Sequence, residues 1–101
     1  MRQETAKIAR AFANGEAANA ARTRTDGRNV WLHGNLIATR TDSGVTLTAA
    51  GWPTRTTVER LNGIASMCNL PARFDLRGGL HVTEGGQRRP VDARASVGFS
   101  I

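Results

Sequence analysis

The sequence predicts an α+β fold: an antiparallel sheet of about five to six strands with one packed central helix and a short N-terminal helix. Two patterns carry this prediction. Apolar residues recur at helical spacing near the N-terminus and again in the middle of the chain. Elsewhere, apolar and polar residues alternate in short runs that glycine-containing turns separate. The length of 101 residues suits one domain with one small core.

The first predicted element is a short helix over residues 3–14, which an Asn-Gly pair ends. Its buried face carries Ile8 and Phe12, with alanines around them. The alanine-rich residues 16–22 are expected to add a turn or two of helix. Because only two side chains on this face are large, we expect the segment to dock loosely on the rest of the protein or on a partner.

Three strands follow, each either rich in β-branched and aromatic residues or alternating between apolar and polar residues. Short turns containing glycine join them, which predicts a meander of antiparallel neighbours. These strands cover residues 30–33, 36–41 and 45–49.

A second helix is predicted after a Gly-Trp-Pro turn. Thr56 and Glu59 have the spacing of a capping box, in which hydroxyl and carboxylate bond the free backbone N–H groups. An apolar stripe follows at helical spacing, Gly63 weakens its middle, and a Leu-Pro pair ends it. Trp52, in the turn before the helix, is expected to anchor the core rather than to offer a surface for base stacking.

The last third returns to strands. Residues 73–77 and 80–83 alternate on either side of a Gly-Gly pair, which is typical of a two-residue hairpin. A second Gly-Gly pair marks another turn, and Pro90 is expected to lie outside any ladder because it has no N–H. Residues 91–101 alternate without a break, which predicts one long, half-buried strand.

The composition narrows the class of protein. Lys7 is the only lysine among 14 basic residues, so the other thirteen are arginines, and the formal net charge is +6. The single cysteine excludes internal disulfides and any zinc site built on a cysteine pair. The chain lacks the ~18–20 residue apolar run of a membrane span and the pattern of a signal peptide. We expect a single domain in a reducing cytoplasm, with a helix and polar linker over residues 1–28 and a compact α+β part over 29–101.

Catalytic groups are few and separated along the chain. His33 lies beside a turn, His81 lies within a hairpin, and Cys68 lies on the apolar stripe of the second helix. Neither histidine has another ligand at metal-binding spacing, and a buried thiol is a small hydrophobe rather than a nucleophile. The sequence therefore predicts that the protein is not an enzyme and uses no metal or cofactor.

The arginines remain as candidate binding residues, because guanidinium groups fit the geometry of phosphates and carboxylates. Arg73 and Arg77 share a strand face with Asp75, and His81 on the partner strand is expected to join that face. Two interpretations stay open: a patch that binds nucleic acid or an acidic protein surface, and an ordinary solvated basic surface. The candidate partner- or nucleic-acid-binding residues are Arg40, Arg55, Arg60, Arg73, Arg77, Arg88 and Arg89.

Arg60 and Asn62 stand two positions apart near the start of the second helix. Polar side chains at such positions are expected to face outward or to bond a neighbouring loop. For Asn62, we expect a tie to the strand loop near Asn35, slightly ahead of a role in contacting a partner.

Three segments resemble a group of small phage and prophage proteins: TRTDG at residues 23–27, WLHGNLIA at 31–38 and AGWPTRTTVERLNGI at 50–64. Those proteins share an LHGN-type hairpin, a GW turn and a TT-x-x-RLN helix start, and their alanine-rich N-terminal helix is also similar. The last third departs from the pattern, because LHVTEG stands where relatives often carry an aromatic strand ending in Asn-Gly. The resemblance implies a compact accessory protein of a bacteriophage or mobile element, a class that includes anti-CRISPR proteins.

From this resemblance and the basic scaffold, we expect an anti-CRISPR-type inhibitor that acts in the cytoplasm of the host bacterium. It is expected to bind a Cas surveillance complex, on the Cas protein or its guide RNA, and to block target DNA binding or nuclease recruitment. The alternative is a small phage nucleic-acid-binding regulatory protein without catalytic activity, and a virion-assembly component is a third possibility. No membrane partner is expected, and the oligomeric state stays open.

Overall fold

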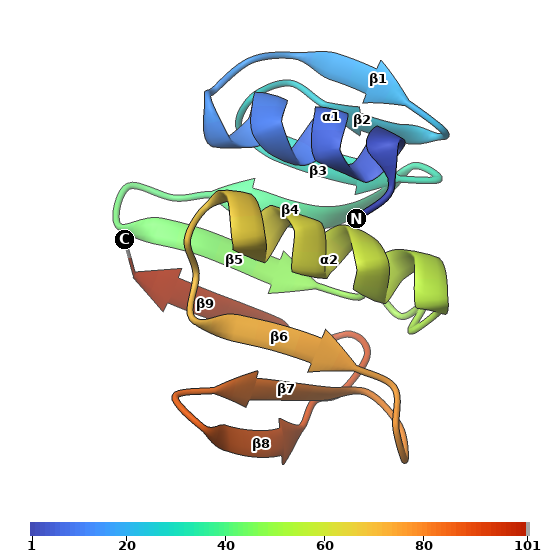
Figure 1. Ribbon diagram of the computed structural model, residues 1–101, viewed down its shortest axis with the longest axis vertical. Helices are drawn as coiled ribbons and strands as arrows, with labels where there is room; N and C mark the ends of the chain where they lie inside the picture. Colours follow the sequence, from blue (N-terminus) through green and yellow to red (C-terminus); the bar gives the residue numbers. More distant parts are fainter. Residues whose placement is uncertain (101) are drawn as a thin grey trace.

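The computed structural model describes residues 1–100 and confirms the α+β fold. Over these residues, two helices and two antiparallel sheets form the molecule (Figure 1). The helices are α1 (Gln3–Ala13) and α2 (Arg55–Met67). The large sheet contains β1 (Ala18–Ala20), β2 (Thr23–Thr25), β3 (Asn29–Leu32), β4 (Asn35–Arg40), β5 (Gly44–Thr48) and β9 (Ser96–Ser100). The small sheet contains β6 (Ala72–Asp75), β7 (His81–Glu84) and β8 (Gln87–Pro90).

The large sheet has the strand order β1-β2-β3-β4-β5-β9. Its first five strands are neighbours along the chain, so the predicted three-stranded meander is present as β3, β4 and β5 and is extended by two strands before it. The C-terminal strand β9 returns to pair with β5, where Val45 lies opposite Phe99 and Leu47 opposite Val97. The last strand of the described chain, β9, is therefore an edge strand of the large sheet, although it is distant in sequence from β5 (Figure 1).

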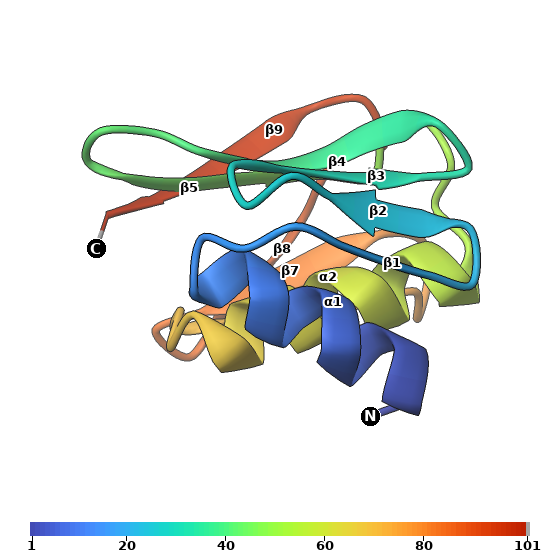
Figure 2. The same ribbon diagram turned by 90° about the horizontal axis from the view of Figure 1, so that it is seen from above.

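The two helices and the small sheet lie on one side of the large sheet (Figure 2). Their apolar side chains meet in one core, which includes Phe12 of α1, Leu61 of α2, Leu47 and Phe99 of the large sheet and Val82 of the small sheet. The small sheet therefore shares the core of the large sheet instead of forming one of its own.

The N-terminal segment differs from its prediction in two ways. Residues 18–20 form strand β1 and not a further helical turn, because Ala18–Ala20 pairs with Thr23–Thr25 of β2. Helix α1 also packs firmly and not loosely: Ile8 and Phe12 are 1% and 0% exposed.

Helix α2 begins earlier than the capping-box pattern predicted. Thr54 is the N-cap, and its side-chain oxygen accepts a hydrogen bond from the Thr57 N–H at 3.2 Å. The predicted capping box of Thr56 and Glu59 is therefore wrong. Glu59 is engaged elsewhere, because its carboxylate accepts hydrogen bonds from the Arg2 backbone N–H and the Thr5 hydroxyl.

The C-terminal third forms strands where alternation predicted them, but with different limits. The first Gly-Gly pair lies in a longer loop between β6 and β7, whereas Gly85-Gly86 forms a two-residue turn between β7 and β8. Pro90 is the last residue of the edge strand β8, opposite His81, so it lies inside a ladder at a position that needs no donor.

The predicted long strand over residues 91–101 is shortened to β9 in the described chain. Asp92 forms a turn: its side chain accepts from the Arg94 N–H at 2.8 Å, and its carbonyl accepts from the Ala95 N–H at 3.0 Å. This Asx turn carries the chain from the small sheet to the large one. Neither of the two helices formed by residues 1–100 is long and apolar enough to cross a membrane.

Candidate functional site

The outer face of the small sheet gathers three of the predicted arginines. Phe74 and Val82 point into the core at 3% and 0% exposure, so the alternate residues of their strands face outward. Arg73, Thr83 and Arg88 stand opposite one another across all three strands. We call the outward-facing set Arg73, Asp75, Arg77, His81, Thr83 and Arg88 the basic face.

One carboxylate holds part of this face in place. The Arg88 guanidinium donates to both oxygens of Asp75, Nε to Oδ2 at 3.1 Å and Nη2 to Oδ1 at 2.8 Å. The hydrogen bonds from the Arg88 side chain, with another from the Arg77 backbone N–H, lower the pKa of Asp75 to about 2. Asp75 is therefore ionised at physiological pH and fixes the Arg88 side chain across the sheet.

The other two arginines of the basic face keep their guanidinium groups available. Within residues 1–100, neither Arg73 nor Arg77 forms an ion pair, and both are exposed. They border a surface depression of about 440 Å³ together with Asp75 and Thr83. The predicted sharing of one face by these arginines, Asp75 and His81 is confirmed; whether the face binds a partner stays a prediction.

The remaining candidate arginines do not join the basic face. Arg89 stands opposite Val82, on the other side of the small sheet, and pairs with Glu84 at 3.3 Å. Arg55 is exposed in the first turn of α2. Arg40 is partly buried, because its guanidinium donates to the Phe12 carbonyl at 2.6 Å and lies 4.9 Å from the centre of the Phe12 ring. Arg40 therefore ties α1 to the large sheet.

Arg60 is a structural residue, and the expectation that it faces outward is wrong. Its side chain is 3% exposed and donates to Glu59 at 2.6 Å, to Thr23 at 3.0 Å and to Thr5 at 2.5 Å. Burial alone raises the pKa of Glu59, but hydrogen bonds from Thr5, Arg2 and Arg60 outweigh it and lower that pKa. The cluster connects α1, α2 and β2, and leaves Arg60 no surface to offer a partner.

Asn62 makes a tie of the predicted kind, but to a different segment. Its amide donates to the Phe74 carbonyl at 3.0 Å and accepts from the Phe74 N–H at 2.7 Å. The side chain thus acts as a neighbouring strand and covers the edge of β6, far along the chain from the expected loop at Asn35.

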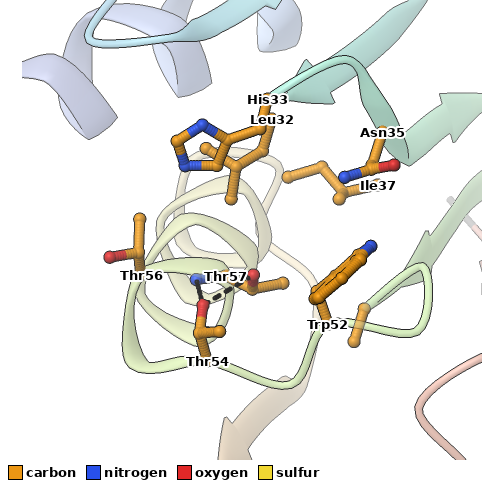
Figure 3. A pocket seen from close by; sticks show the side chains of 9 residues that line it. Leu32, His33, Asn35, Ile37, Trp52, Thr54, Thr56 and Thr57 are labelled. Carbon is orange, nitrogen blue, oxygen red and sulfur yellow. Dashed lines mark hydrogen bonds between the residues drawn. The ribbon is translucent and has the colours of Figure 1, made fainter.

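A second surface feature is a cleft between the β3–β4 turn and the start of α2 (Figure 3). It has a volume of about 450 Å³, with Leu32, Ile37 and Ala49 among its lining residues. His33 and Trp52 lie on opposite sides of it (Figure 3). Trp52 is 61% exposed, so the expectation that it anchors the core is wrong. The sequence did hold a signal that Trp52 is exposed. Trp52 precedes a proline in a turn, and no large apolar residue stands at strand or helix spacing from it.

The candidate catalytic groups do not come together in the described chain. His33 lines the cleft, His81 lies on the small sheet, and Cys68 lies at the C-terminus of α2. Residues 1–100 contain no group of three or more His, Cys, Asp or Glu side chains that could hold a metal ion. Burial raises the pKa of the half-buried Cys68 thiol, and Arg40 offsets this only in part.

The fold and its surface define a small basic α+β protein with an arginine-rich face on its second sheet. The chain matches the Kyanoviridae Gp96 protein family over residues 1–80, and it belongs to this family of phage proteins. The resemblance to phage proteins is thereby confirmed. No curated protein and no solved structure matches the chain. The match includes the whole cleft, whereas His81, Thr83 and Arg88 of the basic face lie beyond its last residue.

Proposed function

We propose that this phage protein is an inhibitor that docks, without catalysis of its own, on a CRISPR–Cas surveillance complex of the host. The observation that supports the proposal is the gathering of Arg73, Arg77 and Arg88 on the outer face of the small sheet. Guanidinium groups bind carboxylates and phosphates in a forked geometry, so this face suits acidic Cas surfaces or guide-RNA phosphates. Docking there blocks target DNA binding or nuclease recruitment.

The ordered positions of the basic-face arginines also favour docking. Arg73 and Arg88 stand on strands of a sheet whose inner side chains are buried in the core, so their backbone positions are fixed before a partner arrives. Arg77 lies in the turn that follows β6. The ion pair with Asp75 orders Arg88 further. A surface that is ordered in advance loses less entropy on binding.

The test compares two variants with equal loss of charge. One replaces the basic-face residues Arg73, Arg77 and Arg88 by alanine; the control replaces Arg2, Arg10 and Arg28, which are exposed elsewhere. Each is expressed in a host whose CRISPR immunity blocks a test phage, and plaques are counted. The wild type and the control should restore plaques, and the basic-face variant should not. Unchanged immunity with the wild type contradicts inhibition of that system, and equal activity of the two variants contradicts the basic face as the docking surface.

A regulatory protein that binds nucleic acid through the same face is the second candidate. It is favoured by the guanidinium groups of Arg73 and Arg77, which form no ion pair with any of residues 1–100 and can contact phosphates directly. In gel shifts over a salt series, log K should fall linearly with log salt, and the basic-face variant should reduce the slope by about one for each lost phosphate contact. An absence of binding at low salt removes this candidate and leaves the first untouched.

A further inference from the structure

The cleft between the β3–β4 turn and α2 has the chemistry of a nucleobase pocket. Trp52 lines the cleft with 61% of its surface exposed, and it is not among the core residues that residues 1–100 contribute. An exposed indole offers a flat face on which any base can stack. The apolar floor of Leu32 and Ile37, which are 3% and 1% exposed, excludes water from one side.

Polar groups around the floor can recognise the edge of a base. The His33 imidazole, from the β3–β4 turn, and the Asn35 amide, from the first residue of β4, both line the cleft (Figure 3). An amide carries a donor and an acceptor side by side, which is the pattern that the edge of a base requires. His33 stands at a positive φ of 51°, in a two-residue turn between paired Leu32 and Asn35, and this conformation sets the direction of its ring.

Charge around the cleft favours a polyanion. None of its nine lining residues is acidic. Three exposed arginines stand next to residues of the cleft without lining it. Arg55 lies between two lining threonines along the chain, the Arg22 backbone carbonyl accepts from the His33 N–H at 2.9 Å, and the Arg94 side chain lies beside Gly51, which precedes Trp52. The Asp92 carboxylate, two residues before Arg94, accepts from the Arg94 backbone N–H. A strand whose base enters the cleft therefore has basic residues on three neighbouring segments available to its phosphates.

We propose that this cleft binds an unstacked base of a single-stranded nucleic acid, with the base on Trp52 and the adjoining phosphates on the neighbouring arginines. The site is distinct from the basic face, and it does not depend on the proposed docking to a surveillance complex. Stacking on Trp52 tolerates every base, so any sequence preference comes from the contacts of Asn35 and His33 with the edge of the base.

The test follows the fluorescence of Trp52 in a Trp31→Phe background, which removes the other tryptophan. Single-stranded DNA and RNA oligonucleotides of mixed sequence are titrated at low salt, and a mononucleotide and a duplex are titrated in parallel. Single strands should quench the emission to saturation, and added salt should weaken the binding. By anisotropy of a labelled strand, Trp52→Ala should weaken the affinity about 5- to 150-fold, and Trp52→Phe should retain most of it.

The basic-face variant provides the matched control. It should keep the quenching and most of the affinity, which separates a failure of the cleft from a failure of the proposed docking surface. Binding that Trp52→Ala leaves unchanged, or that the basic-face variant abolishes, overturns the proposal. So does the absence of quenching by any single strand at low salt, or saturation by a mononucleotide alone, which indicates a free-nucleotide site. A folded state of each variant is checked by circular dichroism.

Discussion

Arg60 shows how a single residue can hold three elements together. Its guanidinium lies at 3% exposure among Glu59 of its own helix, Thr5 of α1 and Thr23 of β2. Replacement by alanine leaves the Glu59 carboxylate without its cation and two hydroxyls without a donor. We expect Arg60→Ala to lower the free energy of unfolding by about 3 kcal/mol, measured by urea denaturation. The exposed Arg55→Ala in the same helix should change it by less than about 0.5 kcal/mol.

The same cluster makes stability depend on pH. The pKa of Glu59 is lowered by folding, so its contribution to stability is complete above its ordinary value of 4.5 and is lost as the pH falls through the folded pKa. The urea midpoint of the wild type should therefore fall below pH 4.5 more steeply than that of Glu59→Gln, which has no carboxyl to protonate. Parallel curves for the two proteins contradict a stabilising role for the Glu59 carboxylate.

Residue environments were the least predictable level of the structure. The pattern that placed Arg60 near a helix start did not reveal that Thr23, distant in sequence, supplies an acceptor for it. The size and apolar character of Trp52 predict a place in the core, yet its side chain is 61% exposed. Both outcomes depend on contacts between distant segments, and the spacing of residues within one segment does not predict such contacts.

At the scale of elements, Gly63 has a role opposite to the one its helix propensity suggests. Within α2 it lies where α1 approaches, and a Cβ built on it meets the Thr5 methyl group. Propensity alone predicts that Gly63→Ala stabilises the helix by about 1 kcal/mol. Because the added methyl forces α1 away, we expect a net loss of about 1–3 kcal/mol in urea denaturation. Ser66→Ala, on the exposed side of the same helix, should be neutral or slightly stabilising. A gain in stability for Gly63→Ala contradicts close packing of the two helices.

Two threonines at the start of α2, Thr54 and Thr56, are candidates for the N-cap, and the sequence alone favoured the wrong one. The Thr54 hydroxyl accepts from the Thr57 N–H and lies 3.0 Å from the Thr57 hydroxyl, which is buried. Thr54→Ala should therefore cost about 1–2 kcal/mol of unfolding free energy. Thr56→Ala should cost less than about 0.5 kcal/mol, because the N-cap of the helix is Thr54 and not Thr56. Thermal denaturation of both variants checks the order, and the reverse order supports the capping box.

Element types were predicted correctly where a segment had a clear hydrophobic period. They were predicted wrongly where the same pattern fitted two kinds of structure. Alternation found β4, β5 and β7, and helical spacing found α1 and α2. Residues 18–20 are alanine-rich, and their strand exists only because β2 lies beside them as a partner. Residues 91–95 alternate like a strand, but the local hydrogen bonds of Asp92 favour a turn.

For the whole molecule, the sequence predicted the fold class but not how the strands are shared between sheets. The return of β9 to β5, which leaves β6, β7 and β8 as a second sheet, follows from pairing between residues that are distant along the chain. The basic face, in contrast, arises from local pairing, since Arg73 and Arg88 stand on either side of Thr83 in the consecutive strands β6, β7 and β8. The sequence predicted Arg73, Arg77, Asp75 and His81 on one face because they share one hairpin, and the third strand then adds Arg88.

The shared core predicts that the molecule unfolds as one unit. Phe12 of α1 belongs to the same cluster as Val82 of the small sheet and Phe99 of the large sheet. Phe12→Ala should therefore lower the free energy of unfolding by about 3–5 kcal/mol, and urea curves followed by circular dichroism and by tryptophan fluorescence should shift together. Lys7→Ala, on the exposed side of α1, serves as the control and should change stability by less than about 0.5 kcal/mol. If Phe12→Ala melts α1 while the transition followed by tryptophan fluorescence stays in place, α1 unfolds independently of the rest. If the circular dichroism and fluorescence transitions move together, the N-terminal helix is part of the structural unit that carries both the cleft and the basic face.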